Sequence, residues 1–198
     1  MSRGSAARRL VHGALTAVAV IAATLGAAAD AVSFYGLNFP DQLDGAQVGE
    51  THDFESTDPG LGYGVRYHKP GWTMDVYIYD LGRSAIPSDL NSKVVKAQLA
   101  QAHGDIFALE KKHTYAEVKR TGSHTLKDHA GHARFLCEDF SYVDSALGKV
   151  DSFLCLTSWQ GKFVKFRLTT GHGPDTGGDA RRFMKAWMPV LWPDGQTQ

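Results

Sequence analysis

Residues 133–170 read ARFLCEDFSYVDSALGKVDSFLCLTSWQGKFVKFRLTT, three runs of strand-forming residues separated by two short turns. These runs, and residues 115–126 before them, are separated by short turn sequences at 128–131, 145–148 and 160–161, which is typical of successive β-strands. The sequence therefore predicts four successive strands at 115–126, 132–144, 150–159 and 162–170. Parallel neighbours would need connections of roughly a dozen or more residues, so we expect all four strands to be antiparallel.

The two cysteines of the chain lie on consecutive expected strands. A hairpin centred on Ala146 places Cys137 directly opposite Cys155, and opposed residues have Cα atoms about 4.5–5.5 Å apart, within the range that a disulfide tolerates. Two other interpretations are a pair of buried reduced thiols and a redox-active pair, but redox pairs usually occur as Cys-x-x-Cys at the start of a helix. We therefore predict a structural disulfide.

The same register sorts the side chains onto two faces of the sheet. One face forms the expected core, although Asp139 falls on it and needs a polar partner. The core face consists of Phe135, Cys137, Phe153, Cys155, Val164, Phe166 and Leu168. The reverse face consists of Leu136, Glu138, Phe140, Tyr142, Leu154, Leu156, Lys165 and Arg167. This mixed face is too apolar to be fully solvated and too charged to be fully buried, so we expect a helix to cover half of it or a ligand to bind there.

Three further elements are expected around these strands. Residues 62–79 predict a β-hairpin, because two runs of alternating side chains flank a short loop. Residues 88–112 carry apolar side chains every three or four positions, which predicts a helix with Ser88 as its N-cap. A final helix is expected near the C-terminus, with Pro189 and Pro193 marking its end. Its apolar face consists of Ala180, Phe183, Met184, Trp187 and Leu191.

The order of elements is hairpin, helix, four-stranded meander and helix, and an antiparallel sheet packed against two helices belongs to the α+β class. Over most of residues 62–192 this order resembles that of the PsbP-like exported proteins. The resemblance implies a sheet that lies between helices, and it transfers no functional residue. We expect one α+β domain at 62–192, an irregular lead-in at 32–61 with a short strand near 48–54, and a C-terminal tail at 193–198.

The N-terminal residues have the order of a secretory signal peptide. Three arginines precede an apolar stretch at 14–25, and small residues follow it. The apolar stretch is shorter than the ~20 residues that a helix needs to cross a bilayer. We predict that residues 1–31 are cleaved off after Ala31. The mature chain should then be a soluble protein of the periplasm or the exterior, without a stable membrane anchor.

The composition of the chain argues against several classes of function. Hydrophobic residues make up 43% of the 198 residues, and 21 Lys and Arg balance 21 Asp and Glu. This balance is globular and argues against nucleic-acid binding. Two cysteines are too few for a four-cysteine zinc site. No local motif indicates a cofactor, and we assign none.

A cluster of histidine and aspartate residues surrounds the expected turn at 128–132. Imidazole and carboxylate groups are ligands of Zn²⁺, which makes the cluster a candidate metal site. Hairpin turns, however, favour Asp and Gly for conformational reasons and commonly expose histidine. We therefore assign no metal. The candidate ligands are His124, Asp128, His129 and His132.

A group of aromatic residues on the hairpin and the mixed face is the second candidate site. Such rings could stack on a sugar or a peptide, although aromatic residues also favour strands and cores. The candidate binding surface consists of Tyr63, Tyr67, Tyr77, Tyr79, Phe140 and Tyr142.

The chain contains neither a Gly-x-Ser-x-Gly nor a His-Glu-x-x-His motif. We therefore favour a non-catalytic exported protein that binds an unidentified partner protein or small ligand through the aromatic hairpin or the mixed face. The alternative is an exported, hydrolase-like enzyme whose site combines distant residues. Acid and base groups that converge in a large pocket would favour the enzyme, whereas an apolar or aromatic surface would favour binding.

Overall fold

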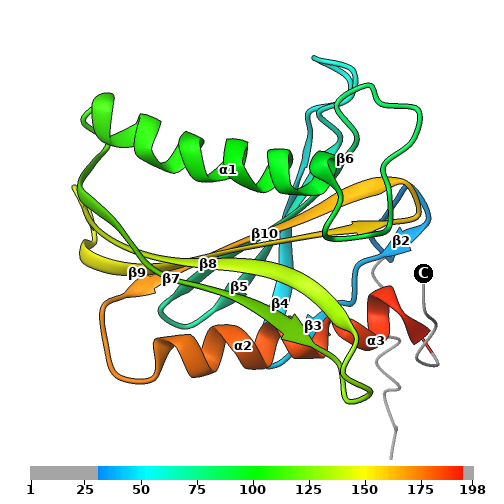
Figure 1. Ribbon diagram of the computed structural model, residues 1–198. Helices are drawn as coiled ribbons and strands as arrows, with labels where there is room; N and C mark the ends of the chain where they lie inside the picture. Colours follow the sequence, from blue (N-terminus) through cyan, green and yellow to red (C-terminus); the bar gives the residue numbers. More distant parts are fainter. Residues whose placement is uncertain (1–30, 194–198) are drawn as a thin grey trace, which may run out of the picture. The chain divides into compact units, whose positions relative to one another are not determined.

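The computed structural model describes residues 31–193. The expected signal peptide, apart from Ala31, and the expected C-terminal tail, apart from Pro193, lie outside the described residues. An eight-stranded antiparallel sheet in the order β3-β4-β5-β6-β10-β9-β8-β7 forms the centre of the fold. Helix α1 lies on one face of this sheet and α2 on the other, so the fold is α+β (Figure 1). Within 31–193 no helix has the length and apolar character to span a membrane.

The C-terminal half of the sheet is the predicted meander. Its strands are β7 (Tyr115–Lys127), β8 (Ala133–Asp144), β9 (Gly148–Trp159) and β10 (Lys162–Gly171). Each strand pairs antiparallel with the next. Tight turns separate β8, β9 and β10, which fixes the register that the sequence predicts.

Cys137 and Cys155 are register partners in β8 and β9. Their Cα atoms lie 4.1 Å apart and their sulfur atoms 2.04 Å apart, so the two residues are at disulfide-bonding distance. Phe166 of β10 faces Cys155 from the other side. The bond therefore links two inner strands of the sheet within the buried core.

The predicted hairpin consists of β5 (Tyr63–Lys69) and β6 (Trp72–Tyr79). The short loop between the two strands consists of Pro70 and Gly71, because His68 and Lys69 belong to β5. The other edge of β6 pairs with β10 over its whole length, which places Tyr77 beside Lys165. This pairing joins the hairpin to the meander.

The segment expected to be an irregular lead-in contains four strands. β1 (Ser33–Phe34) and β2 (Leu37–Asn38) form a small sheet, whereas β3 (Gln42–Leu43) and β4 (Ala46–Asp53) extend the large sheet beyond β5. β4 corresponds to the short strand expected near 48–54, but it begins at Ala46, most of its side chains are exposed and a register shift interrupts it between Val48 and Thr51. An exposed, interrupted edge strand shows no regular alternation.

The boundaries of the helices differ from the prediction. α1 spans Lys93–Lys111, and its N-cap is Ser92, whose Oγ accepts a hydrogen bond from the backbone N–H of Val95 at 3.2 Å. The expected cap, Ser88, lies in the preceding loop. The spacing of Ile86 and Leu90 resembles the apolar pattern of a first helical turn. These side chains are buried in the core, although they belong to a loop.

The final helix is divided into α2 (Thr176–Ala186) and α3 (Met188–Leu191). Pro189 lies in the first turn of α3, where its missing N–H would have no intrahelical partner, so it begins a helix instead of ending one. The predicted apolar face is confirmed: its members pack on the core face of the sheet.

The disulfide generates the first prediction. The bond closes a loop with a sequence separation of 18 residues. Cross-linking a loop of this length lowers the entropy of the unfolded chain and stabilises the fold by about 3 kcal/mol. We expect Cys137→Ser, Cys155→Ser and the double variant to lose a similar amount of unfolding free energy in urea titrations. Two free thiols in the denatured, unreduced native protein would contradict the bond.

Candidate functional site

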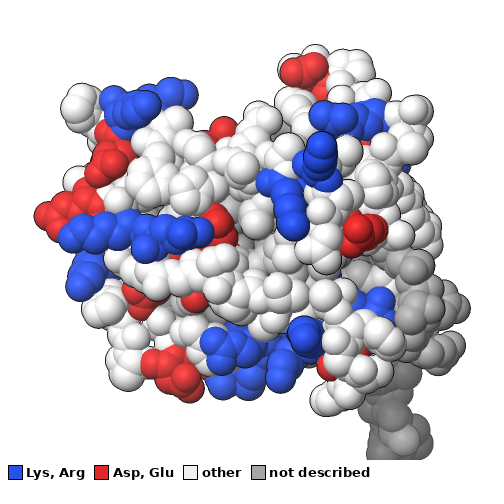
Figure 2. Space-filling view, viewed as in Figure 1, with Lys and Arg blue, Asp and Glu red and all other residues white. Residues whose placement is uncertain are grey.

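A groove lies between α1 and the part of the sheet formed by β6 and β10. The C-terminal half of α1 packs on β7, β8 and β9 through Ala102 and Ile106, and this leaves the neighbouring strands less covered. Two pockets of about 260 and 230 Å³ adjoin here, because both are lined by Tyr77, Asp105 and Lys165. In Figure 2 the surface dips between α1, at the upper left, and the loops at the upper right.

A polar cluster fixes α1 beside this groove. Glu138 of β8 is buried and accepts hydrogen bonds from His103 of α1 at 2.7 Å and from Arg120 of β7 at 3.1 Å. The His103 ring also stacks on Phe107 of the same helix. Glu138 belongs to the mixed face and lies beneath α1. The two hydrogen bonds offset the free-energy cost of burying its carboxylate.

Lys165 lies in the floor of the groove, between Leu156 of β9 and Tyr77 of β6. Its Nζ is 4.5 Å from the centroid of the Tyr77 ring and 5.5 Å from that of Tyr79, which are cation–π distances. Burial lowers the pKa of Lys165, although attraction to Asp105 opposes this shift.

The ammonium group of Lys165 lacks a counter-ion in the described part of the chain. Lys69 and Lys162 each form an ion pair with an aspartate, whereas no carboxylate of residues 31–193 pairs with Lys165. A largely buried cation that forms no ion pair destabilises a fold, and the attraction to Asp105 offsets only part of this effect, since the pKa of Lys165 remains lowered. The position therefore suits an anionic group that arrives from outside.

Arg167, two residues along β10, presents a second cation on the same face. Its Nη2 donates to the hydroxyl of Tyr142 at 3.2 Å, while Nη1 is buried without a hydrogen-bond partner among residues 31–193. Burial would raise the pKa of Tyr142, but the Arg167 guanidinium and neighbouring hydrogen bonds hold it below its ordinary value. Tyr115, which also lines the groove, stacks on Tyr142 with 4.0 Å between ring centroids.

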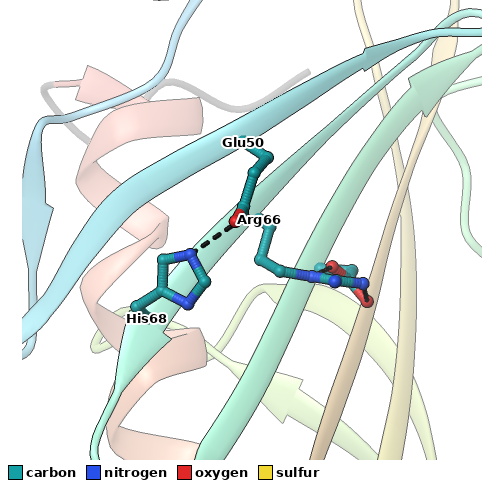
Figure 3. Close-up of polar contacts among 4 residues, drawn as sticks. Glu50, Arg66 and His68 are labelled. Carbon is teal, nitrogen blue, oxygen red and sulfur yellow. Dashed lines mark hydrogen bonds and ion pairs between the residues drawn. The ribbon is translucent and has the colours of Figure 1, made fainter.

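The two carboxylates that line the groove leave these cations uncompensated. Asp75 of β6 accepts two hydrogen bonds from Arg66 of β5, at 2.7 and 3.2 Å, so its charge is already balanced. Figure 3 shows Arg66 beside a second polar contact, between Glu50 of β4 and His68 of β5, whose side chains are 2.8 Å apart. Asp105 is exposed on α1 and forms no ion pair within 31–193.

The predicted aromatic surface is divided between the two faces of the sheet. Tyr67 is 0% exposed and packs with Phe183 and Trp187 under α2. Tyr63 is half-buried on that face and stacks on Phe34. These two residues therefore belong to the core, because neighbouring helices and strands cover their face. The prediction that Tyr67 forms part of a binding surface is wrong, whereas Tyr63 is partly exposed at the edge of the core.

The other four aromatic residues lie on the α1 face. Phe140 is 1% exposed, Tyr142 3% and Tyr79 5%, so these three residues are buried in the core beneath α1 and its neighbouring elements. Tyr77 is half-buried and lines both pockets of the groove. Burial raises the pKa of its hydroxyl to about 12. The candidate aromatic surface thus contracts to Tyr77 and the edge of Tyr79 that lines one pocket.

The four candidate metal ligands are not brought together. His124 lies 3.6 Å from Asp139 on the core face, and this contact gives the half-buried carboxylate a polar neighbour. At the turn, Asp128 bonds to His132 at 3.2 Å and to Arg134 at 2.8 Å, and these contacts help to lower its pKa to about 2, against a desolvation effect that raises it. His129 lines a separate pocket. No group of three or more His, Cys, Asp or Glu residues within 31–193 is arranged for a metal ion.

Other residues of the groove were not identified from the sequence, because α1 and two loops contribute them. They carry no periodic signal, and the exposed apolar residues among them stand singly beside Gly and Asp in the sequence. They are Phe54, Leu61, Leu81, Gln98, Gln101 and Asp105.

Comparison with known proteins gives similarity in structure only. No protein-family model and no curated protein sequence matches the chain. The solution structure of a cyanobacterial PsbP from Synechocystis has a TM-score of 0.41 and 13% identity, over 72% of this chain and 84% of that chain. The Ran-binding protein Mog1p of Saccharomyces cerevisiae has a TM-score of 0.34 and 9% identity, over 74% and 91%. We transfer no function from either protein.

The uncompensated cations generate the second prediction. We expect Lys165→Met to raise the unfolding free energy at pH 7, by about 1 kcal/mol, because it removes an unpaired buried charge. Because the pKa of Lys165 is lower in the folded protein than the unfolded value of 10.5, the buried charge reduces the unfolding free energy fully at neutral pH. Above pH 10.5 the lysine is neutral in both states, so this reduction is absent. The gain should therefore shrink as the pH rises toward 10.5 in urea titrations. Exposed Lys149 provides a control, Lys149→Met, without this pH dependence.

Proposed function

We propose that this protein is an exported, non-catalytic binding protein that holds an anionic ligand in the groove between α1 and the sheet. One observation carries the proposal: Lys165 and Arg167 lie side by side in the groove, and no carboxylate of the described chain pairs with either. Residues that bind ligands commonly reduce stability in the unliganded protein. Aromatic walls favour binding further, since rings can cover an apolar part of the ligand.

The cavity that is larger than the groove lacks the acid and base groups that the enzyme alternative needs, whereas the pocket lined by His129 also contains Asp128 and Lys185. This cavity, of about 530 Å³, lies between the β1–β2 segment, the β9–β10 turn and α3. Its described lining includes Ser88, Ser158 and Trp159 but no His, Asp, Glu, Lys or Arg. Hydrolysis by general acid–base catalysis needs such groups to converge. The described lining of the cavity therefore offers no site of this kind.

Export is supported by the sequence of the N-terminus and by the disulfide. Disulfides persist in oxidising compartments such as the periplasm and the exterior. The residue that follows the expected cleavage site takes part in the described fold, because the carbonyl of Val32 accepts a hydrogen bond from the backbone N–H of Phe39 at 2.8 Å. Cleavage after Ala31 would leave this contact intact.

The third prediction concerns the mature N-terminus. We expect N-terminal sequencing of the native protein to begin at Val32, since small residues precede the cleavage position. Recovery of intact Met1 in a membrane fraction would contradict export as a protein without an anchor.

The fourth prediction tests the groove with a site-specific photo-crosslinker. p-Benzoylphenylalanine in place of Gln101, which is exposed and lines the groove, should cross-link to a component of native envelope extract. The same amino acid in place of Lys149 is the control. The adduct at position 101 should disappear when Lys165→Met and Arg167→Met are added, because the anion loses both cations.

Lys165→Met alone keeps the result interpretable, because we expect this variant to fold at least as stably as the natural chain. Equal cross-linking at positions 101 and 149 would contradict the proposed function. So would an adduct that survives the removal of both cations.

A further inference from the structure

Three exposed apolar side chains gather at one end of the groove. Phe54 is 37% exposed, Leu61 42% and Leu81 37%, and all three line the pocket that contains Tyr79 and Lys165. Among residues 31–193, Leu147 at 63% is the other large apolar side chain with comparable exposure, and it lies on the β8–β9 turn. We call Phe54, Leu61 and Leu81 the apolar shelf.

The apolar shelf is held in place by two closely packed loops. Gly60 and Gly62 have positive φ angles of 96° and 66°, and a Cβ at Gly62 would overlap the carbonyl oxygen of Ile78. The carboxylate of Glu55 accepts hydrogen bonds from the backbone N–H groups of both glycines, each at 2.9 Å. The backbone N–H of Leu81 donates to the carbonyl of Gly60 at 2.7 Å.

These contacts present the shelf as a preformed surface. Apolar side chains that are exposed on a fixed backbone lose little entropy when a ligand covers them. A contiguous exposed apolar cluster at the edge of a charged groove is typical of an interaction site. The cluster and the two cations are independent observations, and both point to the same groove.

From this arrangement, and on the basis of the proposed function, we propose that the groove binds an extended segment of a partner protein in which an acidic side chain lies near a bulky apolar one. Lys165 and Arg167 bind the carboxylate, and the apolar shelf covers the apolar side chain. The two subsites adjoin, because the pockets that contain them share Tyr77, Asp105 and Lys165.

Two features favour a protein segment over a free amphiphile such as a fatty acid. Both pockets are small and open to solvent along α1, at about 260 and 230 Å³, whereas sites for small molecules bury most of the ligand. Asp105 faces the groove from α1 and repels a second carboxylate nearby. The occupant is therefore a segment with one acidic side chain at this point and not a run of acidic residues.

Fluorescein-labelled peptides that contain one Glu and one Leu, separated by one to three glycines, test this proposal by fluorescence anisotropy. At least one spacing should bind, and replacing its Glu by Gln should weaken binding by about tenfold or more, as expected for a charge-assisted contact. Leu61→Ser in the protein should weaken the same peptide by about fivefold, because a leucine contact is lost. Leu147→Ser, the matched exposed leucine, should leave binding unchanged.

Sodium dodecanoate is the second probe, and its displacement of the peptide is measured in the same assay. Binding of dodecanoate with no binding of any peptide would overturn the protein-segment proposal in favour of a free amphiphile. Equal losses for Leu61→Ser and Leu147→Ser would overturn the role of the apolar shelf. Either result is compatible with groove-dependent cross-linking at position 101, so failure of this inference is distinguishable from failure of the proposed function.

Discussion

The pairing of β6 with β10 is the constraint on which both the fold and the groove depend. It places Phe166 beside Val76 in the core and Lys165 beside Tyr77 in the groove. Without it the N-terminal hairpin and the C-terminal meander would be two small sheets, each with an exposed edge. The pairing also explains why one strand serves two purposes, because alternate side chains of β10 face α2 and the groove. Core packing on one face therefore fixes the positions of the two cations on the other.

Local features of the sequence predicted the meander, its register and the disulfide position. Tight turns leave almost no freedom of register, so the position of Cys137 determined that of its partner Cys155. The pairing of β6 with β10 could not be predicted in the same way, because the two strands are far apart in the sequence and alternation identifies faces but not neighbours. The aromatic residues were assigned to a surface for the same reason. The sequence pattern alone is compatible with an exposed or a buried Tyr67, because only the position of α2 decides between the two.

The sequence also predicted only part of the candidate site. Lys165 and Arg167 were recognisable in the sequence as charges on a face too apolar to be solvated, and half-coverage by a helix was one of the expected outcomes. The lateral position of α1, which decides which half is covered, depends on the polar contact between His103 and Glu138 across two elements. The apolar shelf depends on backbone contacts at two glycines. Neither kind of interaction leaves a periodic pattern in the sequence.

The position of β10 and α2 near the end of the chain has a consequence for biosynthesis. A ribosome releases the N-terminus first, so the apolar side chains of β5 and β6, such as Val65 and Met74, exist well before the elements that bury them. Until then these strands offer an unpaired edge and an uncovered face to other chains. The core closes only after α2 has been synthesised. A nascent chain with this topology therefore remains incompletely folded until its last elements have left the ribosome.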